Sequence, residues 1–293
     1  MNTSNKDFFN PCFLFRIITK LTHRIIIGDF MRLCTFFICL MFTFSPVQPV
    51  SYPCKSSIII KQGTNEIIEG KNIYATQSVA SISKIMTAII AIENLNVLEE
   101  IKINHHVSKA YGSSVYLKEG DTITILDLLY GLMLRSGNDC AIVLESLIVD
   151  FVDLMNQKAK ELNMNYTKFQ NTSGLDQEDG GNISCVYDMA ILMSYAMNHE
   201  LFRQIVGCEK YERLDGNGYW TNKNKLLFNY DLCIGGKTGY TKKAGRTLVT
   251  CASNGDFDLI CVTFRCPEDF EYHENLYKLY FKKYQYFFDL DTF

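Results

Sequence analysis

The sequence predicts an α+β fold in which the two ends of the chain form one antiparallel sheet and the middle forms helices. Residues 56–72 read as a hairpin, with two short strands around a Gly-Thr-Asn turn. Three further strand-like runs fill the last third, at 234–240, 245–253 and 257–266. The chain then has an aromatic-rich helical segment, 273–288, which needs a sheet face to cover. We therefore expect an α/β sandwich whose first hairpin joins the same sheet as the last three strands.

The composition is that of an ordinary globular protein. The chain has 293 residues, of which 47% are hydrophobic and 21% are charged, which is enough for a sizeable core. The formal net charge of -3 gives no reason to expect nucleic acid or an anionic membrane surface as a partner. The sequence has no repeat and no long linker, so we expect a single domain over residues 51–293.

Residues 1–50 have a different character, and we interpret them as a leader and a secretory signal peptide. Arg32 precedes a run from Leu33 to Phe44 that is apolar except for its threonines. Such a run is too short to span a bilayer comfortably but fits the apolar region of a signal. Met31 is a candidate true start. Since no clean cleavage site follows, the segment could remain as an N-terminal membrane anchor; the alternative is a buried helix of a cytoplasmic protein.

The middle of the chain carries the helical pattern. Residues 81–95 are apolar all round, which predicts a buried central helix. Residues 122–148 read as two helices broken at 135–138. Thr124 with Asp127 suits a cap at the start of the first of these helices. Two amphipathic helices follow, at 151–163 and 186–199.

Eleven cysteines raise the question of a disulfide framework. Three of them lie in or before the signal segment, several others fall at apolar positions, and the sequence has no C-x-x-C pair. The histidines have no zinc-like spacing to the cysteines, so we expect no metal and no other cofactor. We expect the remaining cysteines to be free core residues, since a buried thiol behaves as a small hydrophobe. They are Cys54, Cys140, Cys185, Cys208, Cys233, Cys251, Cys261 and Cys266.

The segment SVASISKIMTAIIAIE, 78–93, places a serine and a lysine in an apolar helix. Ser81 and Lys84 are three residues apart, so they share one face of the helix. A buried amine is pushed toward its neutral form and can take a proton from a neighbouring hydroxyl. The N–H of a serine in the first helical turn is also free to bind an oxyanion. The pattern predicts Ser81 as a nucleophile and Lys84 as its base, although a lysine lying along a helix end is an alternative.

Two further short motifs carry polar residues where a site could form. Ser136-Gly137-Asn138 lies at the helix break, where polar side chains can project into a cleft. Lys237-Thr238-Gly239 lies on a predicted strand, directly after two glycines. Glycine in the interior of a strand indicates a place where a ligand or another segment approaches the backbone closely. Taken singly, the first could be an ordinary turn and the second could contain an exposed lysine of an edge strand.

Together, these motifs resemble those of a known family. S-x-x-K, S-x-N and K-T-G each occur once, in the order found in serine penicillin-binding proteins and serine β-lactamases. The surrounding sequence resembles the low-molecular-weight D-alanyl-D-alanine carboxypeptidases, peptidase family S11. SISKIMTAI, GSSVYLKEGDTITILDLLYGLMLRSGNDCAIVL and GGKTGYTKKAGRTLV carry the likeness, which extends over residues 55–290.

The resemblance implies a β-lactamase/transpeptidase-like fold, with an all-helical lobe beside the sheet and the active site between them. It implies a bacterial enzyme of the cell envelope, secreted or extracytoplasmic, acting on peptidoglycan stem peptides that end in D-Ala-D-Ala. β-Lactams would inhibit it by acylating the nucleophile. The catalytic residues would be Ser81, Lys84 and Ser136, and the substrate-binding residues Asn138, Lys237, Thr238, Gly239 and Tyr240.

The resemblance also implies a role for each group. Ser81 attacks the penultimate carbonyl, and water resolves the acyl-enzyme after the terminal D-alanine leaves. Ser136 relays a proton to the leaving amine, and Asn138 hydrogen-bonds a peptide amide. Lys237 and Thr238 hold the terminal carboxylate. The N–H groups of Ser81 and Tyr240 form the oxyanion hole.

Some features depart from the family pattern, and two rival functions stay open. Ser83 and Cys185 stand where the family usually has other residues, and we expect no C-terminal β-domain after the last helix. A class A-like β-lactamase would need a glutamate in an E-x-x-L-N segment. In the nearest candidate, Glu161-Leu162-Asn163, the leucine follows the glutamate directly, so the spacing between the two does not match the motif. The second rival is a non-catalytic penicillin-binding or cell-wall-binding module.

Overall fold

The computed structural model describes residues 54–177 and 180–290, with side chains up to residue 284. The predictions for residues 1–50, namely the leader, the signal segment, the start at Met31 and the anchor, lie outside the described residues. Within the described ranges, no helix combines the length and the apolar composition that crossing a membrane requires.

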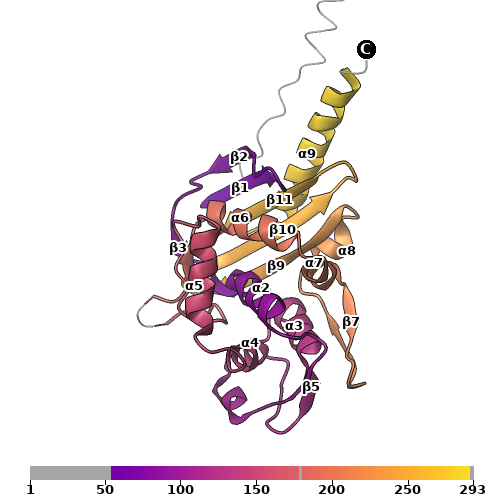
Figure 1. Cartoon of the computed structure of the whole chain (residues 1–293). Coiled ribbons are helices and arrows are strands. Elements are labelled where there is room, and N and C mark those ends of the chain that lie inside the picture. Colours follow the sequence, from indigo (N-terminus) through magenta and orange to yellow (C-terminus); the bar gives the residue numbers. More distant parts are fainter. Residues whose placement is uncertain (1–53, 178–179, 291–293) are drawn as a thin grey trace, which may run out of the picture. The chain divides into compact units, whose positions relative to one another are not determined.

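Five antiparallel strands form the main sheet, in the order β2-β1-β11-β10-β9 (Figure 1). The first hairpin therefore joins the sheet of the last three strands, as the sequence predicted. The strands are β1 (Ser56–Lys61), β2 (Ile67–Lys71), β9 (Cys233–Thr241), β10 (Gly245–Ser253) and β11 (Asp258–Phe264).

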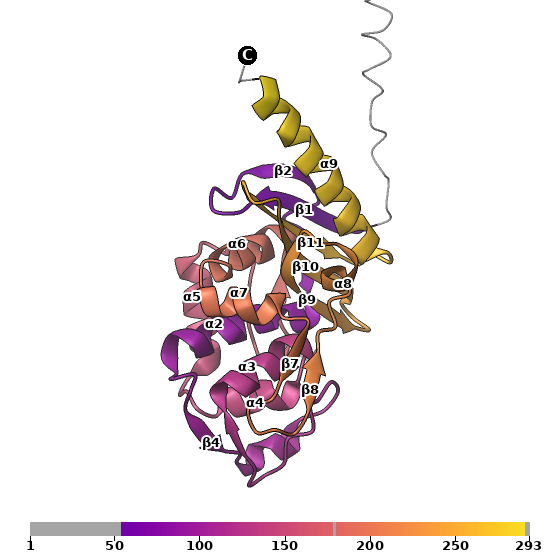
Figure 2. The same cartoon turned by 90° about the vertical axis from the view of Figure 1, so that its right-hand side faces the viewer.

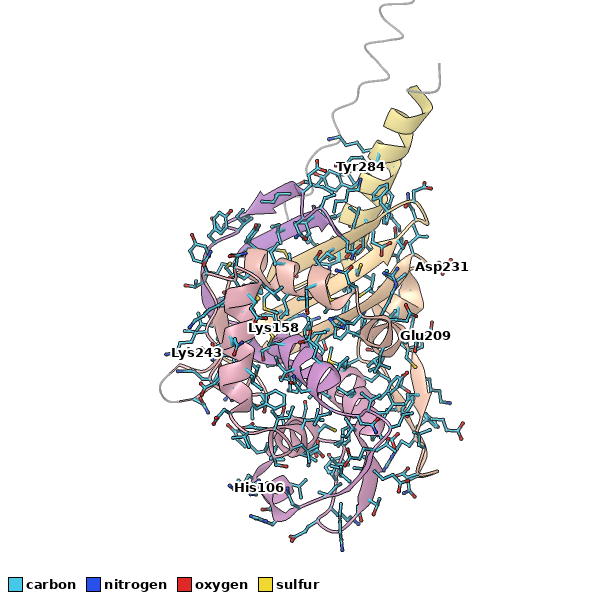
Figure 3. All side chains as sticks on the ribbon, viewed as in Figure 1. His106, Lys158, Glu209, Asp231, Lys243 and Tyr284 are labelled. Carbon is cyan, nitrogen blue, oxygen red and sulfur yellow. A yellow bond between two sulfur atoms is a disulfide. The ribbon has the colours of Figure 1, made fainter. Side chains whose placement is uncertain are left out.

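Both faces of the sheet are covered by other elements. A strand that is buried on both faces needs apolar residues at successive positions, which explains the continuous apolar run in β1. Ile58 and Ile60 belong to the core on the helical-lobe side, whereas Ile59 belongs to the core under α9 (Asp269–Leu290). Successive side chains of a strand point to opposite faces, which accounts for the alternation. Figure 2 shows α9 on one side of the sheet and α6 (Val186–Ala196) on the other. Side chains fill the space between these layers (Figure 3).

Apart from α8, whose Leu226 and Leu227 belong to the core under α9, the remaining elements form a lobe on the α6 side, with α2 at its centre (Figure 1). Three two-stranded pairs at its edges, β3 with β6, β4 with β5 and β7 with β8, escaped prediction because runs of two or three residues show no periodicity. The helices are η1 (Ala80–Ser83), α2 (Lys84–Asn94), η2 (His105–Lys109), α3 (Ile125–Leu134), α4 (Asn138–Glu145), α5 (Phe151–Glu161), α7 (Glu200–Gly207) and α8 (Leu226–Asn229). The short strands are β3 (Gln77–Ser78), β4 (Glu100–Lys102), β5 (Thr122–Thr124), β6 (Ile183–Ser184), β7 (Lys210–Glu212) and β8 (Tyr219–Thr221).

The central helix begins later than predicted. The sequence predicts a helix over 81–95, but the first turn is the 3-10 helix η1 and the α-helix starts at Lys84. Ala80 has a left-handed φ of 53°, which turns the chain from β3 into η1, and apolar periodicity alone does not reveal such a turn. The burial of α2 is as predicted, since every residue from Lys84 to Ala91 is buried.

The helix break at 135–138 is confirmed. α3 ends at Leu134 and α4 begins at Asn138, and Ser136 between them has a left-handed φ of 62°. The predicted cap is present, because the backbone N–H of Asp127 donates to Thr124 Oγ1 at 3.0 Å.

A buried polar network fixes α9 on the sheet. The ring of His273 lies between two threonine hydroxyls, with Nδ1 2.6 Å from Thr250 Oγ1 and Nε2 3.0 Å from Thr263 Oγ1. The hydroxyl of Tyr277 donates to the carbonyl of Thr250 at 2.8 Å. Burial lowers the pKa of His273 to about 3, so the ring is neutral and satisfied by neutral partners. The terminal helix is therefore positioned by hydrogen bonds as well as by apolar packing.

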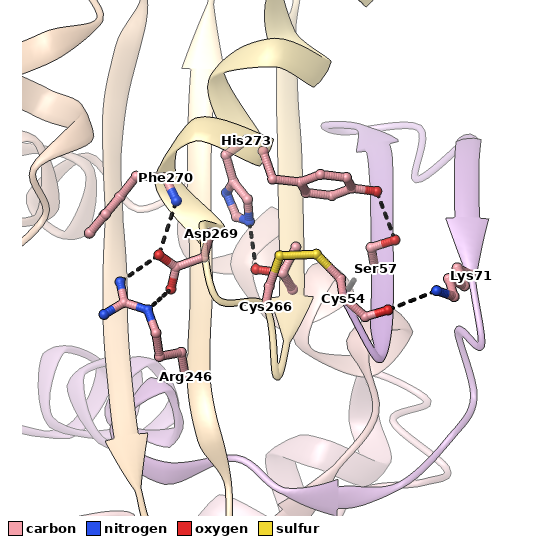
Figure 4. Close-up of a disulfide and its surroundings, with 10 residues drawn as sticks. Cys54, Ser57, Lys71, Arg246, Cys266, Asp269, Phe270 and His273 are labelled. Atoms are coloured by element: carbon pink, nitrogen blue, oxygen red, sulfur yellow. Dashed lines mark hydrogen bonds and ion pairs between the residues drawn. A yellow bond between two sulfur atoms is a disulfide. The ribbon is translucent and has the colours of Figure 1, made fainter. Parts of the chain in front are cut away.

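The prediction that all the later cysteines are free is wrong for two of them. Cys54 and Cys266, 212 residues apart in sequence, form a disulfide beside the start of α9 (Figure 4). In the antiparallel pairing of β1 with β11, Ser56 lies opposite Phe264, so the positions two residues beyond them also face one another. This strand register cannot be deduced from the positions of the two cysteines in the sequence. The prediction holds for Cys140, Cys185, Cys208, Cys233, Cys251 and Cys261.

We expect the double substitution Cys54→Ser/Cys266→Ser to lower the free energy of unfolding by about 2–5 kcal/mol, because the bond restricts a very long loop of the unfolded chain. Thermal unfolding with and without a reducing agent measures this loss. Cys208→Ser, a half-buried free thiol, is the control and should leave the response to reductant intact. Equal melting temperatures for the wild type and the double variant under oxidising conditions would contradict the expectation.

Candidate active site

The structure brings Ser81 and Lys84 into contact. Lys84 Nζ lies 3.2 Å from Ser81 Oγ, as their spacing on one helical face predicts. Lys84 is fully buried, whereas Ser81 is partly exposed. The amine is therefore withdrawn from water while the hydroxyl stays accessible to a ligand.

The other hydrogen-bond partners of Lys84 use two of the bonding positions on its side-chain nitrogen. Nζ donates to Asn138 Oδ1 at 2.8 Å and to the backbone carbonyl of Ser173. Burial lowers the pKa of Lys84 to about 7, and the positive charge of Lys223 acts in the same direction, against opposing contributions from Cys140 and Asp139. A neutral amine has two N–H donors and one lone pair. With both donors engaged, the lone pair faces the hydroxyl of Ser81.

The amide of Asn138 is fixed in one orientation. Its Nδ2 donates to the carbonyl of Tyr111 at 2.6 Å, so its Oδ1 is the atom that faces Lys84. Asn138 is the first residue of α4, and its backbone N–H donates to the carbonyl of Ser113 at 2.7 Å. The helix break therefore places a polar side chain beside the lysine.

A second contact joins the other two motifs. Lys237 Nζ donates to Ser136 Oγ at 3.1 Å and to the carbonyl of Thr238 at 2.8 Å. Lys237 is almost completely buried on β9. Burial lowers the pKa of Lys237 well below its ordinary value, and the positive charges of Lys84 and Lys223 lower it further. An anionic ligand would relieve this repulsion.

Strand β9 approaches the nucleophile closely at Gly239. A Cβ at this position would lie 2.4 Å from Thr247 Oγ1 and 3.1 Å from the backbone nitrogen of Ser81. Any other residue would push the strand away from η1, which explains a glycine in the middle of a strand. Thr238 is half-buried, and the side chain of Tyr240 is 68% exposed. Among the described hydrogen bonds, neither of these two side chains contacts Ser81 or Lys84.

Sequence reasoning missed three contributors to the site. The carbonyls of Ser173 and Tyr111 hold Lys84 and Asn138, and backbone acceptors leave no mark in a sequence. Lys223 stands at the exposed rim, with Nζ 3.4 Å from Ser113 Oγ, and its charge acts on both buried lysines. It lies in TNKNKLL, a stretch that resembles the family, and that likeness could have drawn attention to it.

The carboxylate considered for the β-lactamase function lies elsewhere. Glu161 is at the end of α5, where it forms an ion pair with Lys158 at 3.2 Å. In the described part of the chain, no carboxylate hydrogen-bonds to Ser81 or Lys84. No three His, Cys, Asp or Glu side chains of the described residues converge in a way that could hold a metal ion.

Comparison with known protein sequences identifies the family. The profile of peptidase S11, D-alanyl-D-alanine carboxypeptidase, matches residues 43–267. The chain is 32% identical over 227 residues to the D-alanyl-D-alanine carboxypeptidase DacF of Bacillus subtilis, covering 73% of this chain and 58% of that protein. It is 31% identical over 240 residues to DacC of Escherichia coli, covering 76% of this chain and 59% of that protein. The chain thus spans a little under three fifths of the length of these relatives.

Solved structures agree with the sequence comparison. A D-alanyl-D-alanine carboxypeptidase from Mycobacterium tuberculosis superposes with a TM-score of 0.75 at 27% identity, covering 81% of this chain and 95% of that chain. The Streptomyces K15 DD-transpeptidase superposes with a TM-score of 0.71 at 28% identity, covering 78% and 95% of the two chains. The predicted β-lactamase/transpeptidase-like fold is therefore confirmed, and the chain belongs to the peptidase S11 family of D-alanyl-D-alanine carboxypeptidases.

Proposed function

We propose that the chain is a serine-type D-Ala-D-Ala carboxypeptidase that removes the terminal D-alanine from peptidoglycan stem peptides through an acyl-enzyme on Ser81. One observation carries the proposal. The buried amine of Lys84, with both donors of its neutral form engaged, stands 3.2 Å from a partly exposed serine hydroxyl. That arrangement activates a nucleophile without a histidine.

Acylation begins when Ser81 gives its proton to Lys84 and Oγ bonds to the penultimate carbonyl carbon. The carbonyl oxygen then carries a negative charge, and the N–H groups of Ser81 and Tyr240 stabilise it. Each such donor contributes about 3–4 kcal/mol to lowering the barrier. The close approach of β9 at Gly239 supports this pairing, because it carries the backbone of the strand to that of η1.

The leaving D-alanine needs a proton on its nitrogen as the C–N bond breaks. Ser136 suits the transfer, because its hydroxyl is within 3.1 Å of Lys237 Nζ and can pass a proton to the amine and be reprotonated. The proton that Ser81 gave to Lys84 replaces the one that Ser136 gives to the amine, so in net terms one proton moves from the hydroxyl of Ser81 to the leaving nitrogen. Water then hydrolyses the ester on Ser81.

The terminal carboxylate of the substrate would bind between Lys237 and the hydroxyl of Thr238, with Lys223 as a further cation at the rim. Carboxylate binding offsets the mutual repulsion of these lysines and favours the charged form of Lys237. Asn138 would hydrogen-bond a backbone amide of the stem peptide. Penicillin, which mimics the D-Ala-D-Ala terminus, would acylate Ser81.

We further propose that the protein works outside the cytoplasm, in the bacterial cell envelope, since peptidoglycan is there. The apolar run from Leu33 to Phe44 would direct export and could provide attachment to the membrane.

Incubation with a stem pentapeptide ending in D-Ala-D-Ala tests the proposal. Mass spectrometry should show the loss of one alanine, and a peptide ending in D-Ala-L-Ala should stay intact. A chromogenic cephalosporin should be opened once per enzyme and then only slowly. Steady cephalosporin hydrolysis at many turnovers per minute would favour the β-lactamase, and binding of the cell wall without D-alanine release would favour the non-catalytic module.

A further inference from the structure

Asp139 is a buried carboxylate next to the site that contacts none of the reacting groups, although its charge opposes the lowering of the pKa of Lys84. It is 1% exposed and follows Asn138 in the first turn of α4. No cation forms an ion pair with it among the described residues. Its oxygens accept hydrogen bonds from the backbone N–H groups of Val115 and Leu117 at 3.0 and 3.1 Å, and from the hydroxyl of Ser114 at 2.5 Å.

These donors all belong to one segment, residues 111–117, which we call the Asp139 loop. The helix start contributes only one further donor, the N–H of Cys140 at 3.0 Å. The loop is therefore attached to α4 mainly through a single carboxylate. Hydrogen bonds from neutral donors to a carboxylate are stronger than those between two neutral groups.

The same loop supplies the two acceptors that fix Asn138. The carbonyl of Tyr111 binds its side-chain Nδ2, and the carbonyl of Ser113 binds its backbone N–H. Gly112 between them has a φ of +82°, and a Cβ there would lie 3.1 Å from Asn138 Nδ2. If the loop moved away, the amide of Asn138 would lose the contact that keeps Oδ1 toward Lys84.

We infer that Asp139 is a positioning residue for acylation, which it serves by holding the Asp139 loop so that Asn138 keeps Lys84 against Ser81. This inference rests on the proposed function. Asp139 touches none of the reacting atoms and acts through Asn138. Small displacements of a catalytic group can lower a rate about 100-fold, so the effect should be measurable.

Asp139→Asn tests the inference. The amide keeps the size of the side chain but places an NH₂ group against the N–H donors of the loop. For benzylpenicillin, we expect the acylation rate constant to fall about 10- to 100-fold, while the dissociation constant of the preceding non-covalent complex changes little. Ser114→Ala removes one donor, keeps the charge and should lower the same rate constant about 2- to 10-fold. Ser114→Ala therefore tests the inference even if Asp139→Asn does not fold.

Asp127→Asn is the matched control. Asp127 is equally buried, on the neighbouring helix α3, and accepts from the hydroxyl of Tyr211 at 2.9 Å and the N–H of Leu214 at 3.1 Å. Its loss should lower the melting temperature about as much as the loss of Asp139, without the fall in the acylation rate constant. In a background of Asn138→Ala, Asp139→Asn should add little, because the two residues act in series.

The outcomes separate the inference from the function on which it rests. If the wild type is not acylated by penicillin and releases no D-alanine, the proposed function fails. If the wild type reacts but Asp139→Asn and Ser114→Ala change only the melting temperature, as Asp127→Asn does, the positioning role is wrong. Full additivity of Asp139→Asn with Asn138→Ala would also contradict it.

Discussion

Ser81→Ala should abolish covalent labelling by fluorescent penicillin and lower kcat/KM for D-alanine release by about 10⁴-fold or more. The side chain supplies the oxygen that bonds to the carbonyl carbon, and no other hydroxyl contacts Lys84 Nζ among the described hydrogen bonds. Gel fluorescence after incubation with the labelled penicillin measures the first effect, and mass spectrometry of the pentapeptide measures the second.

Ser83→Ala is the matched control, because Ser83 is a second serine in the same turn of η1. Its hydroxyl is buried and donates to the carbonyl of Ala80 at 2.9 Å, away from Lys84. This variant should lose some stability and keep its labelling. Labelling of Ser81→Ala at the rate of the wild type would contradict the assignment of the nucleophile.

Lys84→Arg should lower the acylation rate constant about 10²- to 10⁴-fold at pH 8, the range expected for loss of a general base. The guanidinium keeps a positive charge but cannot give up a proton in this pH range, so it cannot accept one from Ser81. In the wild type, the pKa of Lys84 is lowered to about 7 by burial. The neutral, active form therefore accumulates as pH rises, and the acylation rate should increase through about pH 7 and then level off.

Stopped-flow acylation between pH 5 and 9 measures this profile. Lys84→Arg should lose the rise near pH 7, whereas Lys158→Arg should keep it. Lys158 is on α5, ion-paired to Glu93 at 2.9 Å, and its pKa is raised by hydrogen bonds to Glu93, Glu161 and Tyr195 despite its partial burial. A flat profile for the wild type would show that Lys84 is not the base.

Much of the fold could be predicted because its hydrophobic pattern is simple. The run Ile58–Ile60 has no polar residue, which a strand buried on both faces requires, and α2 is apolar on every side because it lies in the centre of the lobe. The left-handed turn at Ala80 and the short strand pairs could not be predicted, since they depend on packing rather than on periodicity.

The contacts of the site were predictable only in part. Ser81 with Lys84 follows from helical spacing, and the meeting of Ser136 with Lys237 follows from the family resemblance. The carbonyl of Ser173 could not be found, because any residue has one. The disulfide was missed because pairing across β1 and β11 needs a register that the sequence does not state.

Peptide mapping after reaction with benzylpenicillin most directly tests whether the three motifs form one reactive site. The protein is quenched during the lifetime of the adduct, digested with a protease and sequenced by tandem mass spectrometry. We expect the penicilloyl group on Ser81 and on no other residue. An adduct on Ser83, Ser136 or another side chain, or an unmodified protein that still releases D-alanine, would contradict the account.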